Sequence, residues 1–147
     1  MLKNIDPLLT GELLDVMQTM GHGDDLVICD RNHPAATIAA HTTHGRLILI
    51  AGATLPQLSS AILKHFPLDT FVEAPIARMQ VVGAPQDELV QAHRDMQVIA
   101  DHYEGRPVGI QALERFAFYE AAKRSFAIVQ TSDPGPYGCF ILKKGVL

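Results

Sequence analysis

The sequence predicts a single α/β domain, a sandwich in which helices flank a mixed, partly parallel sheet. Short continuous apolar runs are typical of strands buried on both faces, and amphipathic helical segments alternate with them along the chain. We expect parallel pairing wherever the connection between two strands is helical. A chain of 147 residues suits one domain, so we assign residues 1–147 to it and leave the strand order open.

The first third of the chain predicts a helix, two strands and a loop. The helix follows Thr10, a favourable N-cap, and ends at Gly21. A buried strand is expected over 26–29 and a second buried strand over 47–50. The segment 31–36 is expected to be a loop, because the residue before its proline avoids the helical region.

The middle of the chain predicts two helices around a strand. Thr54 caps a helix that tolerates Pro56 in its first turn and ends at Pro67. A strand is expected over 79–82, followed by a long helix from about 86 to 103. The sequence Gly-Arg-Pro that follows breaks this helix.

The last third predicts a helix and two strands. The helix runs over 115–124, and the strands run over 126–129 and 139–142. Between the strands, the sequence Asp-Pro-Gly-Pro at 133–136 indicates a rigid turn. These elements complete the expected sandwich.

Charge and hydropathy argue against two kinds of partner. The formal net charge is -4, and the basic residues are scattered apart from the pair Lys143 and Lys144, so nucleic acid is not an expected partner. No apolar run approaches the roughly 20 residues that a membrane span needs. The N-terminus lacks the apolar block of a signal peptide, so we expect a cytoplasmic protein without a membrane partner.

The cysteines and histidines do not indicate a metal site. Cys29 and Cys139 have no metal-ligand spacing, and in a cytoplasmic protein we expect both to be reduced and buried. A shared ligand spacing is also missing among five histidines: His41, His44, His65, His93 and His102.

One cluster of candidate functional residues surrounds the first strand. His22 lies between Gly21 and Gly23, which permit a sharp turn and leave the imidazole accessible. Asp30 follows the strand, where α/β folds usually place binding groups. The alternative is a helix end, a surface histidine and an acid that begins a turn.

Two further polar clusters, Glu114–Glu120 and Pro136–Cys139, also lie at the ends of elements. Arg115 offers a fixed positive fork, and Tyr137 offers a phenol beside backbone amides. Together with the imidazole and carboxylate of the first cluster, these groups suit a small polyhydroxyl ligand. We expect one pocket to gather four of these residues: His22, Asp30, Arg115 and Tyr137.

Five segments that span the chain carry a resemblance to a known family. They are residues 1–9, 20–24, 115–120, 137–138 and 141–146. Together they resemble the L-fucose mutarotase family, whose sister branch is the D-ribose pyranases, and the sequence Arg-Phe-Ala-Phe-Tyr-Glu is specific to the fucose branch. The resemblance implies an α/β fold assembled into homo-oligomeric rings, commonly decamers of two stacked pentamers, with sites near subunit contacts. It also implies interconversion of sugar anomers without a metal or cofactor.

The resemblance also implies roles for individual residues. His22 matches the family's proton donor, Asp30 its sugar-binding acid and Arg115 its sugar-binding arginine. The sugar-contacting tripeptide matches Tyr137, Gly138 and Cys139. Two further candidates remain open: Tyr119 either contacts the sugar or packs on a helix face, and His33 is either a pocket residue or a loop histidine.

The sequence departs from the family in three places. The tripeptide ends in Cys139, whereas the family has an asparagine there, and a thiol cannot supply an amide's strong donor and acceptor. His33 stands where an apolar or aromatic residue is usual. The sequence Leu-Ile-Ala-Gly at 49–52 replaces Arg-Ala-Asp-Gly, so a charged pair is missing. The first departure concerns the sugar site, and the third concerns packing or assembly.

The expected function is therefore a mutarotase for L-fucose or a related aldose, acting by acid/base opening and closure of the ring. His22 transfers one proton, and the second group is Tyr137, Asp30 or a bound water. One alternative is a D-ribose pyranase activity. The other is a non-catalytic monosaccharide-binding protein linked to sugar transport, which the thiol of Cys139 favours.

Overall fold

The computed structural model describes residues 2–147, so Met1 of the first family segment lies outside the described residues. Six strands form one sheet in the order β2-β5-β1-β6-β3-β4. Their bounds are β1 Asp25–Cys29, β2 Leu47–Ile50, β3 Ile76–Met79, β4 Ile110–Leu113, β5 Ala127–Thr131 and β6 Cys139–Lys143. The mixed sheet confirms the predicted fold class.

One strand runs against the other five. β6 pairs antiparallel with both β1 and β3, while the pairs β1–β5, β2–β5 and β3–β4 are parallel. The carboxyl ends of β1 to β5 therefore meet the start of β6 at one edge of the sheet, which we name the carboxyl edge. The opposite edge, where β1 to β5 begin and β6 ends, is the amino edge.

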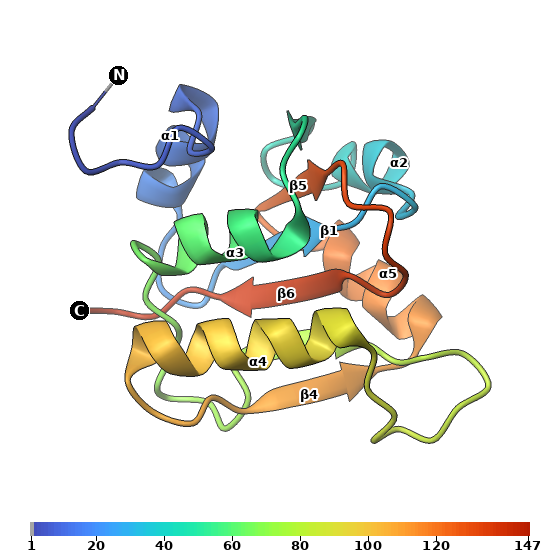
Figure 1. The fold of residues 1–147 in the computed structure, drawn as a ribbon. Coiled ribbons are helices and arrows are strands. Elements are labelled where there is room, and N and C mark those ends of the chain that lie inside the picture. Colours follow the sequence, from blue (N-terminus) through green and yellow to red (C-terminus); the bar gives the residue numbers. More distant parts are fainter. Residues whose placement is uncertain (1) are drawn as a thin grey trace.

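Five helices cover the two faces of the sheet (Figure 1). α1 (Gly11–Thr19), α3 (Leu55–Leu63) and α4 (Gln91–Glu104) pack on one face, and α2 (Ala35–Ala39) and α5 (Arg115–Lys123) pack on the other. The alternation of side chains along β1 places Leu26 and Ile28 in the first core and Val27 and Cys29 in the second. This burial on both faces is what the continuous apolar runs predict.

The predicted helix signals match the structure closely. The side chain of Thr10 accepts the Leu13 N–H and caps α1. Thr54 caps α3 and forms a capping box with Gln57. Gly105 ends α4 in the left-handed conformation, with φ of 65°, which glycine adopts without a steric cost.

Several predicted boundaries are wrong. The strand expected over 79–82 covers Ile76–Met79, and the helix expected from 86 begins at Gln91 because 80–90 forms a loop with a glycine and a proline. The loop expected over 31–36 gives way to α2 at Ala35. The short edge strand β4 was not predicted, since its four residues show neither a continuous apolar run nor a clean alternation.

The strand over 47–50 was predicted correctly in extent but not in burial. It forms β2, the outermost strand on one side of the sheet, and Leu49 is 60% exposed there. An apolar run cannot by itself distinguish a central strand from an edge strand that a partner covers.

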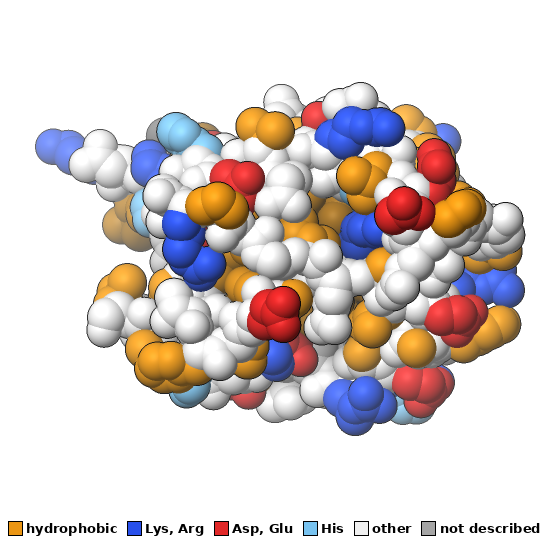
Figure 2. All heavy atoms as spheres, turned by 90° about the horizontal axis from the view of Figure 1, so that it is seen from below, with side chains coloured by type: hydrophobic (Ala, Val, Ile, Leu, Met, Phe, Trp, Pro, Cys, Tyr) orange, Lys and Arg blue, Asp and Glu red, His pale blue; other side chains and the backbone are white. Residues whose placement is uncertain are grey.

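Within residues 2–147, no helix is long and apolar enough to cross a bilayer. On the face seen in Figure 2, positive, negative and apolar side chains are interspersed. This mixed charge pattern agrees with the scattered basic residues of the sequence.

Candidate sugar site

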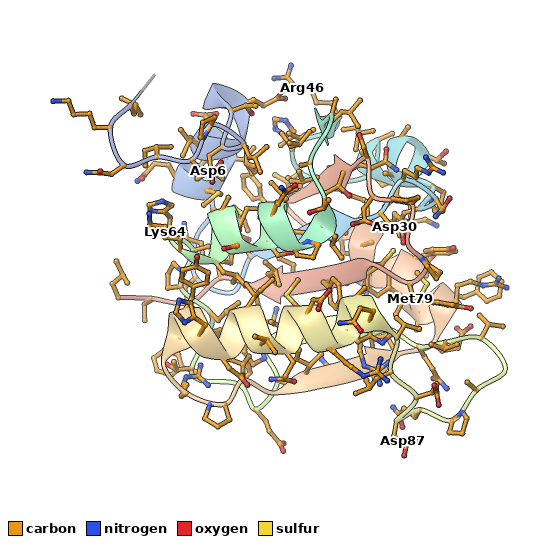
Figure 3. All side chains as sticks on the ribbon, viewed as in Figure 1. Asp6, Asp30, Arg46, Lys64, Met79 and Asp87 are labelled. Carbon is orange, nitrogen blue, oxygen red and sulfur yellow. The ribbon has the colours of Figure 1, made fainter. Side chains whose placement is uncertain are left out.

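The carboxyl edge carries a cavity of about 320 Å³. It gathers most of the predicted site residues, and Figure 3 shows Asp30 and Met79 at the same end of the sheet. Its lining residues are Asp30, Asn32, His33, Met79, Val82, Arg115, Tyr119, Pro136, Tyr137 and Cys139. The cavity therefore combines a carboxylate, a guanidinium, two phenols and an imidazole with three apolar side chains.

Asp30 is the most firmly held of these groups. It is 2% exposed, and each carboxylate oxygen accepts one backbone N–H: Oδ1 from Asn32 at 2.8 Å and Oδ2 from Gly138 at 2.9 Å. Gly138 thus adjoins the site through its backbone. A carboxylate offers about four lone-pair positions, so acceptor capacity remains for a ligand.

Cys139 and His33 form the buried floor of the cavity. The Cys139 Sγ lies 3.7 Å from Asp30 Oδ2 and 3.5 Å from His33 Nδ1. Burial, reinforced by the Asp30 carboxylate, raises the pKa of the Cys139 thiol, so the thiol stays protonated. Burial lowers the pKa of His33 to about 4, so its imidazole is neutral near pH 7. Its Nε2 has no hydrogen-bond partner among residues 2–147.

Arg115 supplies the positive charge of the site. It is the first residue of α5, whose N-terminus is capped by the Glu114 carboxylate through the N–H groups of Phe116 and Ala117. The guanidinium carbon lies 4.6 Å from the centre of the Phe116 ring, and no acid of the described chain forms an ion pair with it. One turn later, burial raises the pKa of Tyr119, whose phenol stays protonated.

Tyr137 has an unusual backbone conformation. Its φ of 58° lies in the left-handed region, which costs a non-glycine residue about 1–2 kcal/mol. Its hydroxyl accepts the Val82 N–H at 3.2 Å, so the loop between β3 and α4 reaches the site. Sequence reasoning missed Val82 because it placed this residue in a strand.

His22 does not reach this cavity within one chain. It precedes β1, whereas Asp30 follows it, so the strand places them at opposite edges of the sheet. A strand of five residues spans about 17 Å. One chain therefore brings Asp30, Arg115 and Tyr137 to one cavity without His22, so a single pocket with all four residues would need His22 from a neighbouring copy.

His22 has well-defined neighbours at the amino edge. Its Nε2 lies 3.2 Å from Asp69 Oδ1, and its ring packs edge-on against Phe71 at 5.3 Å between ring centres. The His22 side chain is 42% exposed, and Phe71 is 72% exposed. An accessible imidazole supported by a carboxylate is suited to proton transfer.

Asp69 is a residue that sequence reasoning missed. It is buried, and its Oδ1 also accepts the Phe71 N–H at 2.9 Å. This backbone hydrogen bond, together with the bond to His22, lowers the pKa of Asp69 and keeps it ionised. The available signal was the sequence Pro-Leu-Asp at 67–69, in which an acid follows the end of a helix and precedes the strand β3.

Neither cysteine forms a disulfide, and both are buried, as predicted. No group of three or more histidines, cysteines or acids in the described part of the chain is arranged to hold a metal ion.

Comparison with known proteins gives consistent matches over the whole length. The model of the RbsD / FucU transport protein family matches residues 3–147. An L-fucose mutarotase of Glaesserella parasuis serovar 5 (strain SH0165) is 40% identical, over 99% of this chain and 96% of its own. The human fucose mutarotase is also 40% identical, over 99% of this chain and 94% of its own. The structure of the fucose mutarotase from Streptococcus pneumoniae in complex with L-fucose has a TM-score of 0.88 at 34% identity, with 99% of each chain covered.

Proposed function

Because this chain belongs to the RbsD/FucU family, we propose that it interconverts the anomers of a monosaccharide, with L-fucose as its first candidate substrate. The observation that carries this proposal is the carboxyl-edge cavity. It holds a fixed carboxylate, a guanidinium without an ion-pair partner among residues 2–147 and two phenols in one small space. Such a set can bind several hydroxyl groups at once.

The binding roles follow from the donors and acceptors of each group. The free lone pairs of Asp30 accept from neighbouring sugar hydroxyls, and the guanidinium of Arg115 donates to hydroxyl or ring oxygens. The Tyr137 hydroxyl accepts from Val82, so its own proton is free to be donated to the sugar. Tyr119, Cys139 and His33 shape the remainder of the cavity.

The chemical step requires a group that exchanges protons near neutral pH. Ring opening removes the anomeric hydroxyl proton and protonates the ring oxygen, and each assisted transfer contributes about 10²–10⁴ in rate. We assign one transfer to His22, because Asp69 anchors its Nε2 and leaves Nδ1 to exchange the proton. Tyr137, Asp30 or a bound water supplies the other.

A neighbouring copy of the chain supplies His22 to the cavity in this proposal. Exposed apolar side chains flank both partners of such a contact: Phe71 beside His22, and Val82 and Phe116 beside the cavity. Exposed apolar groups of this kind mark protein contact surfaces. We therefore expect a homo-oligomer, and the resemblance to the L-fucose mutarotase family implies a ring of five or ten subunits.

Saturation-transfer NMR of anomeric protons tests the proposal on a panel of aldoses that includes L-fucose and D-ribose. We expect the protein to accelerate exchange between the α and β anomers of L-fucose. Faster exchange of D-ribose alone would assign the pyranase activity instead. Sugar binding without accelerated exchange would assign a non-catalytic binding protein, the role that Cys139 favours.

A further inference from the structure

His93 is a buried histidine that does not line the cavity but contacts the turn that does. It lies in the first turn of α4, is 3% exposed, and packs edge-on against Phe140. Its Nδ1 lies 3.3 Å from the Val90 nitrogen, and its Nε2 lies 3.2 Å from the Tyr137 carbonyl oxygen. Both ring nitrogens therefore have backbone partners.

These two partners determine the tautomer of the imidazole. A backbone N–H only donates, so Nδ1 must be unprotonated, and a carbonyl oxygen only accepts, so Nε2 must carry the proton. Burial, reinforced by the positive charge of Arg78, lowers the pKa of His93 to about 4, so this neutral form prevails near pH 7. Nε2–H thus donates to Tyr137.

The acceptor belongs to the peptide group that also fixes Asp30. The Tyr137 carbonyl and the Gly138 N–H lie in one planar unit and point in opposite directions. The carbonyl accepts from His93, and the N–H donates to Asp30 Oδ2 at 2.9 Å. A rotation that broke one of these hydrogen bonds would also misalign the other.

The surroundings leave this peptide group little room. A Cβ atom at Gly138 would lie 2.9 Å from the Leu55 side chain and 3.3 Å from Asp30 Cβ. Tyr137 holds its left-handed conformation with its hydroxyl bonded to Val82 and its carbonyl bonded to His93. His93 thus contributes one of the few bonds that keep this turn in place.

We propose that His93 is a positioning residue of the sugar site, which orients the Tyr137–Gly138 peptide so that its N–H holds the Asp30 carboxylate toward the ligand. This role rests on the proposed sugar-binding function. It acts through three linked groups, from the His93 imidazole through one peptide unit to the carboxylate, and hydrogen bonds in such chains strengthen one another.

The first test needs no sugar, so it is independent of the proposed function. Long-range ¹H–¹⁵N NMR of the whole protein should show His93 protonated at Nε2 alone, and the Gly138 amide proton should resonate downfield. In His93→Leu the Gly138 resonance should move upfield. His93→Gln, whose amide can still donate to the carbonyl, should restore it in part. An Nδ1-protonated wild type, or an unchanged Gly138 resonance in His93→Leu, would overturn the proposal.

The second test separates positioning from mere stabilisation. We expect His93→Leu to raise KM for the exchanged sugar about three- to tenfold, with kcat within about twofold, because the weakened hydrogen bond serves binding. A purely structural loss would lower the amount of active protein and leave KM unchanged, which would contradict the proposal. His102→Leu, an exposed histidine on the same helix, is the matched control and should leave KM at the wild-type value.

Should His93→Leu fail to fold, His93→Gln and the wild-type tautomer still decide the question. A protein that exchanges no sugar but shows the expected tautomer and Gly138 shift would refute the proposed activity. It would leave intact the hydrogen-bonded connection from His93 through the Tyr137–Gly138 peptide to Asp30. The two failures are therefore distinguishable.

Discussion

The two edges of the sheet present histidines in opposite ways. At the carboxyl edge, His33 and His93 are buried, and burial lowers the pKa of each to about 4. At the amino edge, the side chain of His22 is 42% exposed, and its Nε2 is hydrogen-bonded to the ionised carboxylate of Asp69. The first environment suits fixed hydrogen bonding, and the second suits proton transfer.

The comparison supports the proposal that sugar binding and proton transfer use residues from two copies of the chain. The carboxyl edge holds the groups that would bind a sugar, and the amino edge holds the imidazole that would move its proton. Both edges expose apolar side chains beside these groups. An assembly that brings the amino edge of one copy to the carboxyl edge of another would unite them.

The largest expected effect comes from removing the imidazole at the amino edge. His22→Ala should lower the rate of catalysed anomer exchange by about 10²–10⁴ with folding intact, because the His22 side chain is 42% exposed and lies outside the two cores. Saturation-transfer NMR and circular dichroism measure the two effects. His65→Ala, an exposed histidine outside the proposed site, is the control and should exchange at the wild-type rate. Wild-type exchange by His22→Ala would remove this residue from the mechanism.

A complementation experiment tests whether the two edges act between copies. His22→Ala and Asp30→Ala should each be inactive, whereas co-refolded mixtures should recover about a quarter of the wild-type rate, because random assembly pairs the two intact edges at that frequency. Light scattering should report a pentamer or decamer. Mixing the folded proteins without subunit exchange is the control. A monomer, or a mixture without recovered activity, would contradict a site shared between two copies of the chain.

The buried histidines predict an acid-sensitive fold. Their native pKa of about 4 lies below the ordinary value of 6.5, so the unfolded chain binds protons more readily. The free energy of unfolding is therefore unaffected by the protonation of these histidines above pH 6.5. As the pH falls from 6.5 toward 4, it decreases by up to about 3 kcal/mol for each histidine. Urea unfolding at a series of pH values measures it.

A phenylalanine at position 33 provides the matched variant for this pH series. His33→Phe removes one titrating group, so its free energy of unfolding should fall less steeply with acidification than that of the wild type. The lowered pKa of Asp69 acts in the same direction but below its ordinary value of 3.8, in a separate pH range. Equal slopes for His33→Phe and wild type would show that His33 is not a buried neutral histidine.

The smallest expected effect concerns the floor of the carboxyl-edge cavity. Cys139→Asn introduces a strong donor and acceptor next to Asp30, so L-fucose should bind up to about tenfold more tightly, equivalent to 0.5–1.5 kcal/mol for one hydrogen bond. Isothermal titration calorimetry measures the change, and the exchange rate for L-fucose should rise with it. Weaker binding would indicate a cavity tuned to another sugar, with Cys139 and His33 as the source of that preference.

Local sequence signals determined most of the elements and most of the polar residues of the cavity. Thr10 and Thr54 fix helix starts through short-range capping bonds, and the apolar run at 26–29 has the length and purity of a buried strand. Asp30 and Arg115 could be selected as site residues because each directly follows a strand or begins a helix, where polar groups reach the edge of a sheet. Such signals depend on residues within a few positions of one another.

Only the tertiary structure decided which of these groups meet. The insertion of β6 antiparallel between β1 and β3 brings the Tyr137–Gly138 turn onto Asp30, and the same arrangement leaves His22 with Asp69 at the far edge. Strand order and direction result from pairings between residues far apart in the sequence, for example 34 positions for Ile76 and Ile110 and 110 positions for Cys29 and Cys139, and no local pattern encodes them. The sequence by itself therefore determined which residues are available for chemistry, and long-range strand pairing determined that one chain presents them at two separate edges.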